Sequence, residues 1–220
     1  TWHKSEPIKP PRFLTHELCE LLGYYIGECL TKYGISTDSK FCQKRFIELS
    51  KNIFDINVNK KRKGTDVYTD KGKTIEVYLN KCFGISLLNS KKRATYHRIP
   101  ELVLNSSKIE IASFLRAYFD TESYVHKTQG IEISSASIGL IKDTQYALSN
   151  FNIQSSIRKK VINNKPYYLL YIYRYNKIKK FQEEIGLIEK EWQIKKYLDK
   201  NKTGSPNKDT IPVGYLLNRI

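Results

Sequence analysis

Two segments, 94 positions apart, read as copies of one helix that ends in a carboxylate. They run from Leu21 to Glu28 and from Leu115 to Glu122. Small residues four positions apart lie on one face of a helix, and each copy carries such a pair, Gly23 with Gly27 and Ala117 with Thr121. A face of small residues lets two helix backbones approach closely. We therefore expect the two helices to pack side by side.

The paired helices would place the acids that end them next to each other. Glu28 and Glu122 occupy matched positions in the two copies. Neighbouring carboxylates repel each other unless a positive group lies between them, and a divalent metal ion is the usual one. The alternative is a duplicated apolar core helix whose terminal glutamate is merely solvated, which is less compatible with a matched pair than with a single copy.

Charge and composition narrow the class of protein. The chain of 220 residues has 38 Lys and Arg against 22 Asp and Glu, a net charge of +16 spread along the sequence, with 40% hydrophobic and 12% aromatic residues. This composition excludes general disorder, and a basic folded surface favours a polyanion such as nucleic acid over a surface that is only lysine-rich for solubility. No apolar run approaches the ~20 residues of a membrane span, so no membrane association is expected. We find no signal peptide and no disulfide or zinc pattern among Cys19, Cys29, Cys42 and Cys82, which predicts an intracellular protein.

The repeat extends beyond the two helices and predicts two α+β halves, residues 1–105 and 106–220. Helical spacing recurs at 46–54 and 140–151, and strand-like runs occur at 40–44, 74–79, 131–137, 155–158 and 167–174. Each half closes on a similar tetrad, 97–100 and 209–212. Each half therefore reads helix, strands, helix, strands, helix. We expect the two halves to be related by a pseudo-twofold axis, with two antiparallel DNA-binding sheets in the molecule and the two motif helices packed on each other.

Basic residues accompany the predicted strands of both halves. Alternation in the run 167–174 places Tyr167, Leu169, Tyr171 and Tyr173 on one face and Tyr168, Leu170, Ile172 and Arg174 on the other. One face can cover helices while the other meets a ligand. Basic hairpins could clamp phosphates while the strands read base edges, although charged hairpin tips are commonly just solvated turns. The basic residues at these hairpins are Lys60, Lys61, Arg62, Lys63, Lys71 and Lys73 in the first half and Arg158, Lys159, Lys160 and Lys165 in the second.

Together these segments resemble the monomeric two-repeat LAGLIDADG homing endonucleases, from about Phe13 to Ile220. The resemblance rests on the two motif helices, on Gln43 and Lys44 after the first of them, and on the Ile-Pro tetrads, which look like blocks of intein-encoded members. The chain departs from the family where Cys29 and Ser123 stand in place of the glycine that often ends the motif. The resemblance implies a monomer that binds double-stranded DNA at a long asymmetric target and cuts both strands with Mg²⁺ or Mn²⁺.

The resemblance also implies roles for particular residues. Glu28 and Glu122, with the backbone carbonyls of Gly27 and Thr121, would bind the metal, and hard oxygen ligands suit Mg²⁺ better than zinc. Asp120 is expected to form hydrogen bonds near the helix end rather than to ligate metal, because Ile26 occupies its position in the first copy. Further catalytic candidates are Gln43, Arg98 (or His97) and Lys208. Lys44, Ser135 and Arg174 join the basic hairpin residues as expected DNA contacts.

Two other classes of function stay open from the sequence. One is a nucleic-acid binder that does not cut, either an intron RNA maturase or a DNA-binding regulator on the same scaffold. The other is a basic structural protein without a site. The matched pair of acids favours the Mg²⁺-dependent endodeoxyribonuclease, because a pure binder gains nothing from carboxylates near phosphates. Intron or intein origin stays open as well, with the Ile-Pro blocks favouring an intein.

Overall fold

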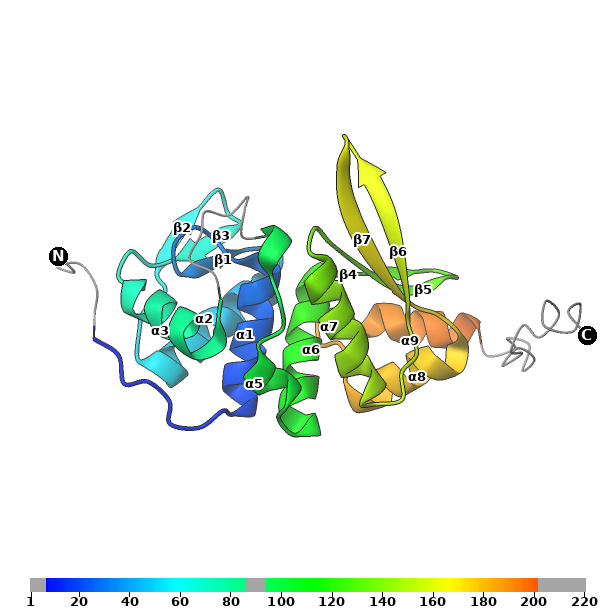
Figure 1. The fold of residues 1–220 in the computed structure, drawn as a ribbon, viewed down its shortest axis with the longest axis horizontal. Coiled ribbons are helices and arrows are strands. Elements are labelled where there is room, and N and C mark those ends of the chain that lie inside the picture. The colour runs from blue at the N-terminus through cyan, green and yellow to red at the C-terminus, as the bar shows by residue number, and fades with distance from the viewer. Residues whose placement is uncertain (1–6, 86–93, 202–220) are drawn as a thin grey trace, which may run out of the picture.

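Two helices side by side form the centre of the molecule, and each carries a sheet and further helices on its outer side (Figure 1). The computed structural model describes residues 7–85 and 94–201. The central helices are α1 (His16–Glu28) and α6 (Lys108–Glu122). Thr15 caps the start of α1 and Ser107 that of α6, each by accepting a hydrogen bond from a backbone N–H of the first turn. Within the described ranges, no helix has the length and apolar character needed to cross a bilayer.

The first half continues from α1 through a small antiparallel sheet that is interrupted by a helix. Its elements are β1 (Gly34–Ser36), α2 (Lys40–Phe54), β2 (Lys60–Arg62), β3 (Asp66–Tyr68) and α3 (Lys73–Phe83). The sheet has the order β1-β3-β2. Ile35 of β1 lies opposite Val67 of β3, and both are buried against the helices.

Two strand predictions in this half are wrong. The run 74–79 lies within α3, because Ile75 and Leu79, one turn apart, are buried on the same helix face, and this packing outweighs the β-branched composition of the run. The run 40–44 forms the first turn of α2, where Ser39 caps the helix by accepting a hydrogen bond from the Cys42 N–H at 3.0 Å. The strand that follows the first motif helix is the shorter β1.

The second half carries the larger sheet. After the short helix α5 (Glu101–Leu104) and α6 come β4 (Ser123–His126), β5 (Gly130–Ser135), α7 (Ile138–Ser149), β6 (Ser156–Ile162), β7 (Lys165–Ile172), α8 (Tyr175–Glu184) and α9 (Glu191–Lys200). The antiparallel order is β4-β5-β7-β6. Asn163 and Asn164 join β6 to β7 with positive φ at both positions, as a two-residue hairpin of type I′ geometry requires. This hairpin projects away from the body of the protein (Figure 1). The expected strands and helix between 131 and 174 are confirmed.

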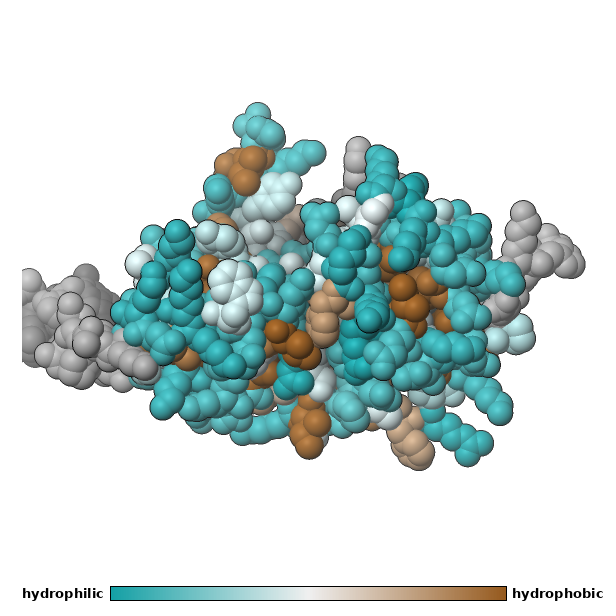
Figure 2. All heavy atoms as spheres, turned by 180° about the vertical axis from the view of Figure 1, so that it is seen from behind, coloured by the Kyte–Doolittle hydropathy of each residue, from teal (hydrophilic) through white to brown (hydrophobic). Residues whose placement is uncertain are grey.

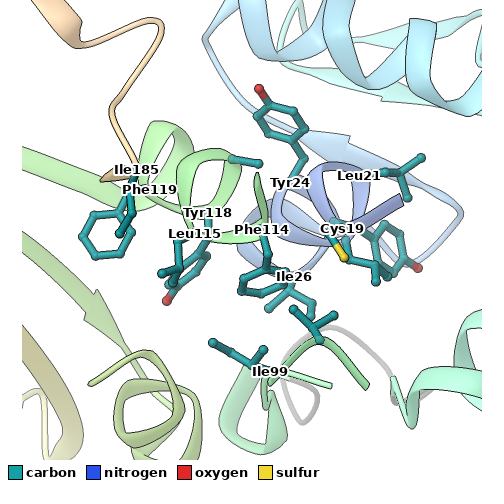
Figure 3. Close-up of a cluster of buried hydrophobic side chains, with 14 of the residues drawn as sticks. Cys19, Leu21, Tyr24, Ile26, Ile99, Phe114, Leu115, Tyr118, Phe119 and Ile185 are labelled. Carbon is teal, nitrogen blue, oxygen red and sulfur yellow. The ribbon is translucent and has the colours of Figure 1, made fainter. Parts of the chain in front are cut away.

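The interface between α1 and α6 confirms the predicted role of the small residues. A Cβ atom added to Gly23 would lie 2.4 Å from the Phe114 carbonyl oxygen and 2.8 Å from the Ala117 Cβ. Apolar side chains of both helices surround this contact, among them Leu21 and Ile26 from α1 and Leu115 and Phe119 from α6 (Figure 3). Ile99 and Ile185 reach the same cluster from outside the two helices (Figure 3). The closest approach of the backbones thus lies inside the hydrophobic core.

The two halves share local geometry as well as the motif helix. Ser39 and Ser137 cap α2 and α7 in the same way. Cys29 bridges to Ile35 in the first half, as Ser123 pairs with Ile133 in the second. The loop between the paired residues is four residues shorter in the first half than in the second. The first half therefore forms only the isolated β-bridge between Cys29 and Ile35 where the second half forms strand β4. The division at residues 105 and 106 falls between α5 and α6 and stays a prediction, and the tetrad 209–212 lies outside the described residues.

Candidate active site and nucleic-acid interface

The two acids meet where the paired helices end. Glu28 is the last residue of α1 and Glu122 the last of α6. A Cβ atom on Gly27 would lie 3.4 Å from the Glu122 Cγ, so the second acid stands against the end of the first helix. Burial raises the pKa of Glu28 to about 7. Burial and the nearby charge of Glu28 raise the pKa of Glu122 to about 8. Each carboxylate is therefore poorly solvated, and the two repel each other when both are charged.

A partly buried lysine, Lys190, lies beside these acids and was not predicted from the sequence. The Lys190 Nζ donates to the carbonyl oxygen of Ser123 at 2.6 Å and lies 3.4 Å from that of Thr121, at the end of α6. Its charge lowers the pKa of both Glu28 and Glu122, while burial lowers the pKa of Lys190 itself. Lys190 follows Ile185-Gly186-Leu187, which repeats Phe83-Gly84-Ile85, but the matching position in the first half is Leu88. The repeat therefore gave no reason to single out this lysine.

Asp120 holds the segment that carries Lys190. Its carboxylate accepts hydrogen bonds from the backbone N–H groups of Ile188 and Glu189, each at 3.2 Å. Burial raises the pKa of Asp120 to about 6 despite these bonds. The prediction that Asp120 forms hydrogen bonds near the helix end is confirmed, and its effect is to position the lysine.

The oxygen atoms at the two helix ends fit a hard divalent cation. Two mutually repelling carboxylates are relieved by a positive charge between them, and carboxylate and carbonyl oxygens are the ligands that Mg²⁺ prefers. Across residues 7–85 and 94–201 no cluster of three or more His, Cys, Asp or Glu side chains could hold a metal ion. A metal bound here would thus depend on Glu28, Glu122, backbone carbonyls such as those of Gly27 and Thr121, and oxygens from water or a bound phosphate.

Gln43, predicted as catalytic, lies inside the first half. Its side chain is buried, and Nε2 donates to the carbonyl oxygens of Thr37 at 2.6 Å and Gly64 at 3.0 Å. Gln43 therefore ties α2 to the β2–β3 hairpin. Lys44, the next residue, is exposed on α2. Ser135 ends β5 and accepts a hydrogen bond from the Ser137 N–H at 3.1 Å.

Arg98 contacts an acid on α7 of the second half. Its guanidinium forms two hydrogen bonds with the Asp143 carboxylate of α7, at 2.6 and 2.8 Å, and the same carboxylate accepts from the Ile99 N–H. This pair joins the segment before α5, in the first half, to α7 of the second. His97 lies closer to the acids, because its Nε2 is 3.8 Å from the Sγ of Cys29, which directly follows Glu28. Lys208 lies outside the described residues.

The larger sheet has one face on the helices and one open face, as the alternation predicts. Leu170 and Ile172 are fully buried, whereas Tyr167 and Tyr171 lie on the opposite side of β7. Cross-strand pairing assigns the basic residues to faces. The open face carries Arg158 opposite Leu169, Lys160 opposite Tyr167, and Lys165 at the start of β7. The guanidinium of Arg158 lies 5.3 Å from the centre of the Tyr171 ring.

Two predicted contacts of this half lie off the open face. Lys159 pairs with Tyr168 and points to the other side of the β6–β7 ribbon. Arg174 precedes α8 with φ of 77°, beside the Tyr173 ring. The hairpin therefore presents cations on both of its sides.

The small sheet also presents cations, but most are paired with acids. Lys60 and Arg62 lie on the open face with Tyr68, whereas Lys61 pairs with the buried Val67 on the other face. Arg62 binds the Asp66 carboxylate at 2.8 Å, Lys60 and Lys32 share Asp70, and Lys73 starts α3 and pairs with Glu76 at 3.0 Å. Lys63 lies in the hairpin turn and Lys71 in the exposed segment before α3. Lys60, Lys61 and Arg62 thus lie on the β2–β3 hairpin, whereas the prediction of a hairpin position is wrong for Lys73, which lies on helix α3.

The face of the molecule opposite to that of Figure 1 is mostly polar. Figure 2 shows a face that is mostly hydrophilic, with apolar side chains confined to small separate patches. The distribution agrees with a net charge of +16 carried by a folded body.

Sequence comparisons match the second half and then the whole chain. Residues 110–186 match the family model described as a LAGLIDADG-like domain. The chain is 30% identical over 236 residues to the replication factor C small subunit of Methanocaldococcus jannaschii, covering 96% of this chain and 12% of that protein. It is 32% identical over 237 residues to the replication factor C small subunit of Thermococcus kodakarensis, covering 98% and 26%. A third relative is the glutamine–fructose-6-phosphate aminotransferase of Methanocaldococcus jannaschii, 27% identical over 165 residues, covering 71% and 15%. The chain thus spans about a quarter or less of each relative.

Solved structures share the arrangement of paired helices and sheets. The homing endonuclease I-DmoI in complex with DNA and Mn has a TM-score of 0.56 at 17% identity, covering 79% of this chain and 98% of that one. Full-length DUF199/WhiA from Thermatoga maritima has a TM-score of 0.53 at 16% identity, covering 96% and 68%. The predicted α+β architecture with two antiparallel sheets is confirmed, and the chain has the LAGLIDADG-type fold.

Proposed function

We propose, from the LAGLIDADG-type fold, that this protein is a site-specific endonuclease that cuts both strands of a DNA duplex and requires a divalent cation. One observation carries the proposal: two partly buried carboxylates, one from each half, meet at the ends of paired helices beside a partly buried lysine. The open sheet faces with their cations flank this site. One acid from each half suits a duplex, whose two strands are related by an approximate twofold axis.

The residues of the site have separable roles in this proposal. Glu28, Glu122 and the carbonyls of Gly27 and Thr121 would hold Mg²⁺ or Mn²⁺. A divalent cation bound there would activate water and neutralise charge on the phosphate and the leaving oxygen. Lys190, held by Asp120, offers its ammonium group to the developing negative charge at the scissile phosphate. Gln43 and Arg98 act through structure, the first by fixing the small sheet and the second by joining the two halves.

Target recognition belongs to the two open sheet faces. Cations such as Arg158, Lys160 and Lys165 bind backbone phosphates and set the register, while neighbouring polar side chains read base edges in the groove. The two sheets differ in size and sequence. The target is therefore asymmetric, and one monomer covers it.

The relatives support an origin as an intein segment. Two of them are named as a replication factor subunit and an aminotransferase, which share no stated activity, yet each contains a stretch similar to this chain. A mobile element inserted into different host proteins would explain why the same stretch occurs in proteins with unrelated names. The target would then be a host coding sequence that lacks the insertion.

A second candidate is a nucleic-acid binder of the same fold that does not cut. The likeness to DUF199/WhiA favours it, because that protein's description names no nuclease. In this case the open faces would still bind DNA or intron RNA, and the acids would have no catalytic part.

Cleavage selection on a randomised or genomic duplex library tests the proposal. With Mg²⁺ we expect one enriched site that is cut, and no cutting with EDTA. Glu28→Gln and Glu122→Gln should each abolish cutting while DNA binding persists, because an amide keeps the shape but loses the charge. Glu101→Gln, at an exposed acid of α5, is the matched control and should cut normally. Binding without cutting under any metal would support the second candidate, and cutting by the double glutamine variant would overturn the site assignment.

A further inference from the structure

A groove at the free edge of the larger sheet is not explained by the site described above. It has a volume of about 230 Å³ and lies between β4 and α9. Residues that line it include Tyr124, His126, Lys127, Trp192, Lys196 and Lys200. Trp192 is 62% exposed and Tyr124 is 61% exposed, which is unusual for such large rings. The buried Tyr197 is also part of its lining.

The groove is continuous with the open face of the sheet. Tyr124 lies directly opposite Glu132 of β5, and Glu132 lies opposite Tyr171 of β7. All three residues therefore share the face that carries Arg158. Because β4 is the outermost strand, a strand of DNA lying across this face would leave the sheet over Tyr124 and meet α9.

The charges at the groove suit a polyanion. The lining includes Lys127, Lys196 and Lys200 and contains no carboxylate. The Lys196 Nζ lies 5.9 Å from the centre of the Trp192 ring. Three acids stand close by in sequence or pairing: Glu132 contacts His126 at 3.0 Å, Glu191 contacts Lys195 at 2.8 Å, and Asp199 directly precedes Lys200 on α9. The three lysines and His126 of the lining still outnumber these acids. An aromatic surface bordered by lysines is the usual form of a site where a base stacks and phosphates are held.

We propose that this groove binds one nucleotide of the DNA strand that flanks the target on the side of the second half. The deoxyribose, or the base of a nucleotide that is not paired, would pack against Trp192 and Tyr124, and the neighbouring phosphates would lie on Lys127, Lys196 and Lys200. The volume is below the roughly 300–1,000 Å³ of pockets that enclose a drug-sized ligand, so it suits part of a polymer. This inference rests on the proposed DNA binding and extends the footprint beyond the sheet.

Fluorescence of Trp192 provides a direct test. The chain has two tryptophans, so Trp2→Phe leaves Trp192 as the sole reporter. The probe is the selected target duplex, or a mixed-sequence duplex at low salt if selection yields no site, without added divalent metal. We expect binding of the duplex to quench the fluorescence of Trp192. When the duplex is shortened at the end that lies against the second half of the protein, it should still bind but no longer quench.

Affinity measurements on variants complete the test. Trp192→Ala should weaken binding of the long duplex roughly tenfold and leave the shortened duplex unaffected. Lys196→Gln and Lys200→Gln should each reduce the slope of log affinity against log salt concentration by about 0.9 for the long duplex. Neither variant should change this slope for the shortened duplex. Tyr146→Ala and Lys142→Gln, at exposed positions of α7, are matched controls that should bind as the parent does.

The outcomes separate this inference from the proposed function. Absence of quenching, with unchanged affinity of Trp192→Ala for the long duplex, would overturn the groove site even if the protein cuts DNA. Quenching and a length-dependent loss in Trp192→Ala would support it even if the protein never cuts. A chain that binds no duplex would overturn both.

Discussion

Glu28 and Glu122 carry an electrostatic cost that the rest of the protein does not relieve. Burial raises the pKa values to about 7 and about 8, even with Lys190 acting in the opposite direction. Asp38, exposed between β1 and α2, raises the pKa of Glu28 further. Such shifts at a solvent-accessible helix end are typical of functional sites, where a bound ligand compensates the cost.

The pH dependence of stability should report these two acids. Because the folded state holds their protons up to a higher pH than the unfolded state, stability falls as pH rises from about 4.5 through about 8. We expect the melting temperature of the Glu28→Gln/Glu122→Gln variant to match the parent at pH 4 and to exceed it by on the order of 5 °C at pH 8.5. Mg²⁺ should raise the melting temperature of the parent at pH 8.5 and not that of the variant. Equal pH profiles for the two proteins would contradict the assignment, and Glu101→Gln should follow the parent.

Lys190 should affect the reaction and the titration together. Lys190→Met is expected to lower the cleavage rate at least about 100-fold, because a partly buried cation beside the site is lost. Since Lys190 lowers the pKa of both glutamates, any residual activity should show its acidic limb at higher pH. Lys195→Met, at an exposed lysine of α9, is the control. A rate loss without any shift of the pH profile would indicate a purely structural role.

The close packing of α1 against α6 limits which residues can stand at Gly23 and Gly27, near the site. At Gly23 the nearest group is a backbone carbonyl, which cannot move without separating the helices, whereas at Gly27 it is the Thr121 hydroxyl, 2.5 Å from an added Cβ. The two glycines therefore tolerate an added methyl group to different degrees.

Alanine substitution at Gly23 and at Gly27 should lower the stability of the fold by different amounts. We expect Gly23→Ala to destabilise the fold by roughly 1–3 kcal/mol or more through overpacking, and Gly27→Ala by less. Thr121→Ala in the Gly27→Ala background should recover stability, because it removes the clashing oxygen. Thermal or urea unfolding of the three variants checks the order, and a smaller loss at Gly23 than at Gly27 would contradict the close helix contact.

The whole molecule presents its charge on two sheets of unequal size. The large sheet projects the β6–β7 hairpin beyond the body, and the small sheet pairs several of its cations with Asp66 and Asp70 (Figure 1). The second half therefore has more unpaired positive charge on its open face than the first among the residues described. We expect it to contribute more of the phosphate contacts.

Salt dependence should locate these contacts. Lys160→Gln removes a cation from the open face and should reduce the slope of log affinity against log salt by about 0.9. Lys159→Gln, one residue away on the other side of the ribbon, should change it less. Filter binding or fluorescence anisotropy over a salt series measures both slopes. Equal effects at the two positions would mean that the hairpin is surrounded by DNA rather than placed on it.

The sequence by itself determined the paired helices, the two acids and the alternation of β7. Small residues at i and i+4 mark a helix face and a period of two marks a strand, and both patterns can be read from neighbouring residues without knowledge of the fold. The sequence also identified Asp120 as a hydrogen-bonding residue, from the mismatch with Ile26. Tertiary packing decided the rest. The run 74–79 became helix α3 because Ile75 and Leu79 face the core, and Gln43 became buried because the β2–β3 hairpin folds over it. Lys190 follows Glu122 by 68 residues and Glu28 by 162, and it reaches the two acids only because Asp120 anchors its segment at the end of α6. Contacts between distant segments leave no periodic signal in a single sequence, so this part of the site required the fold.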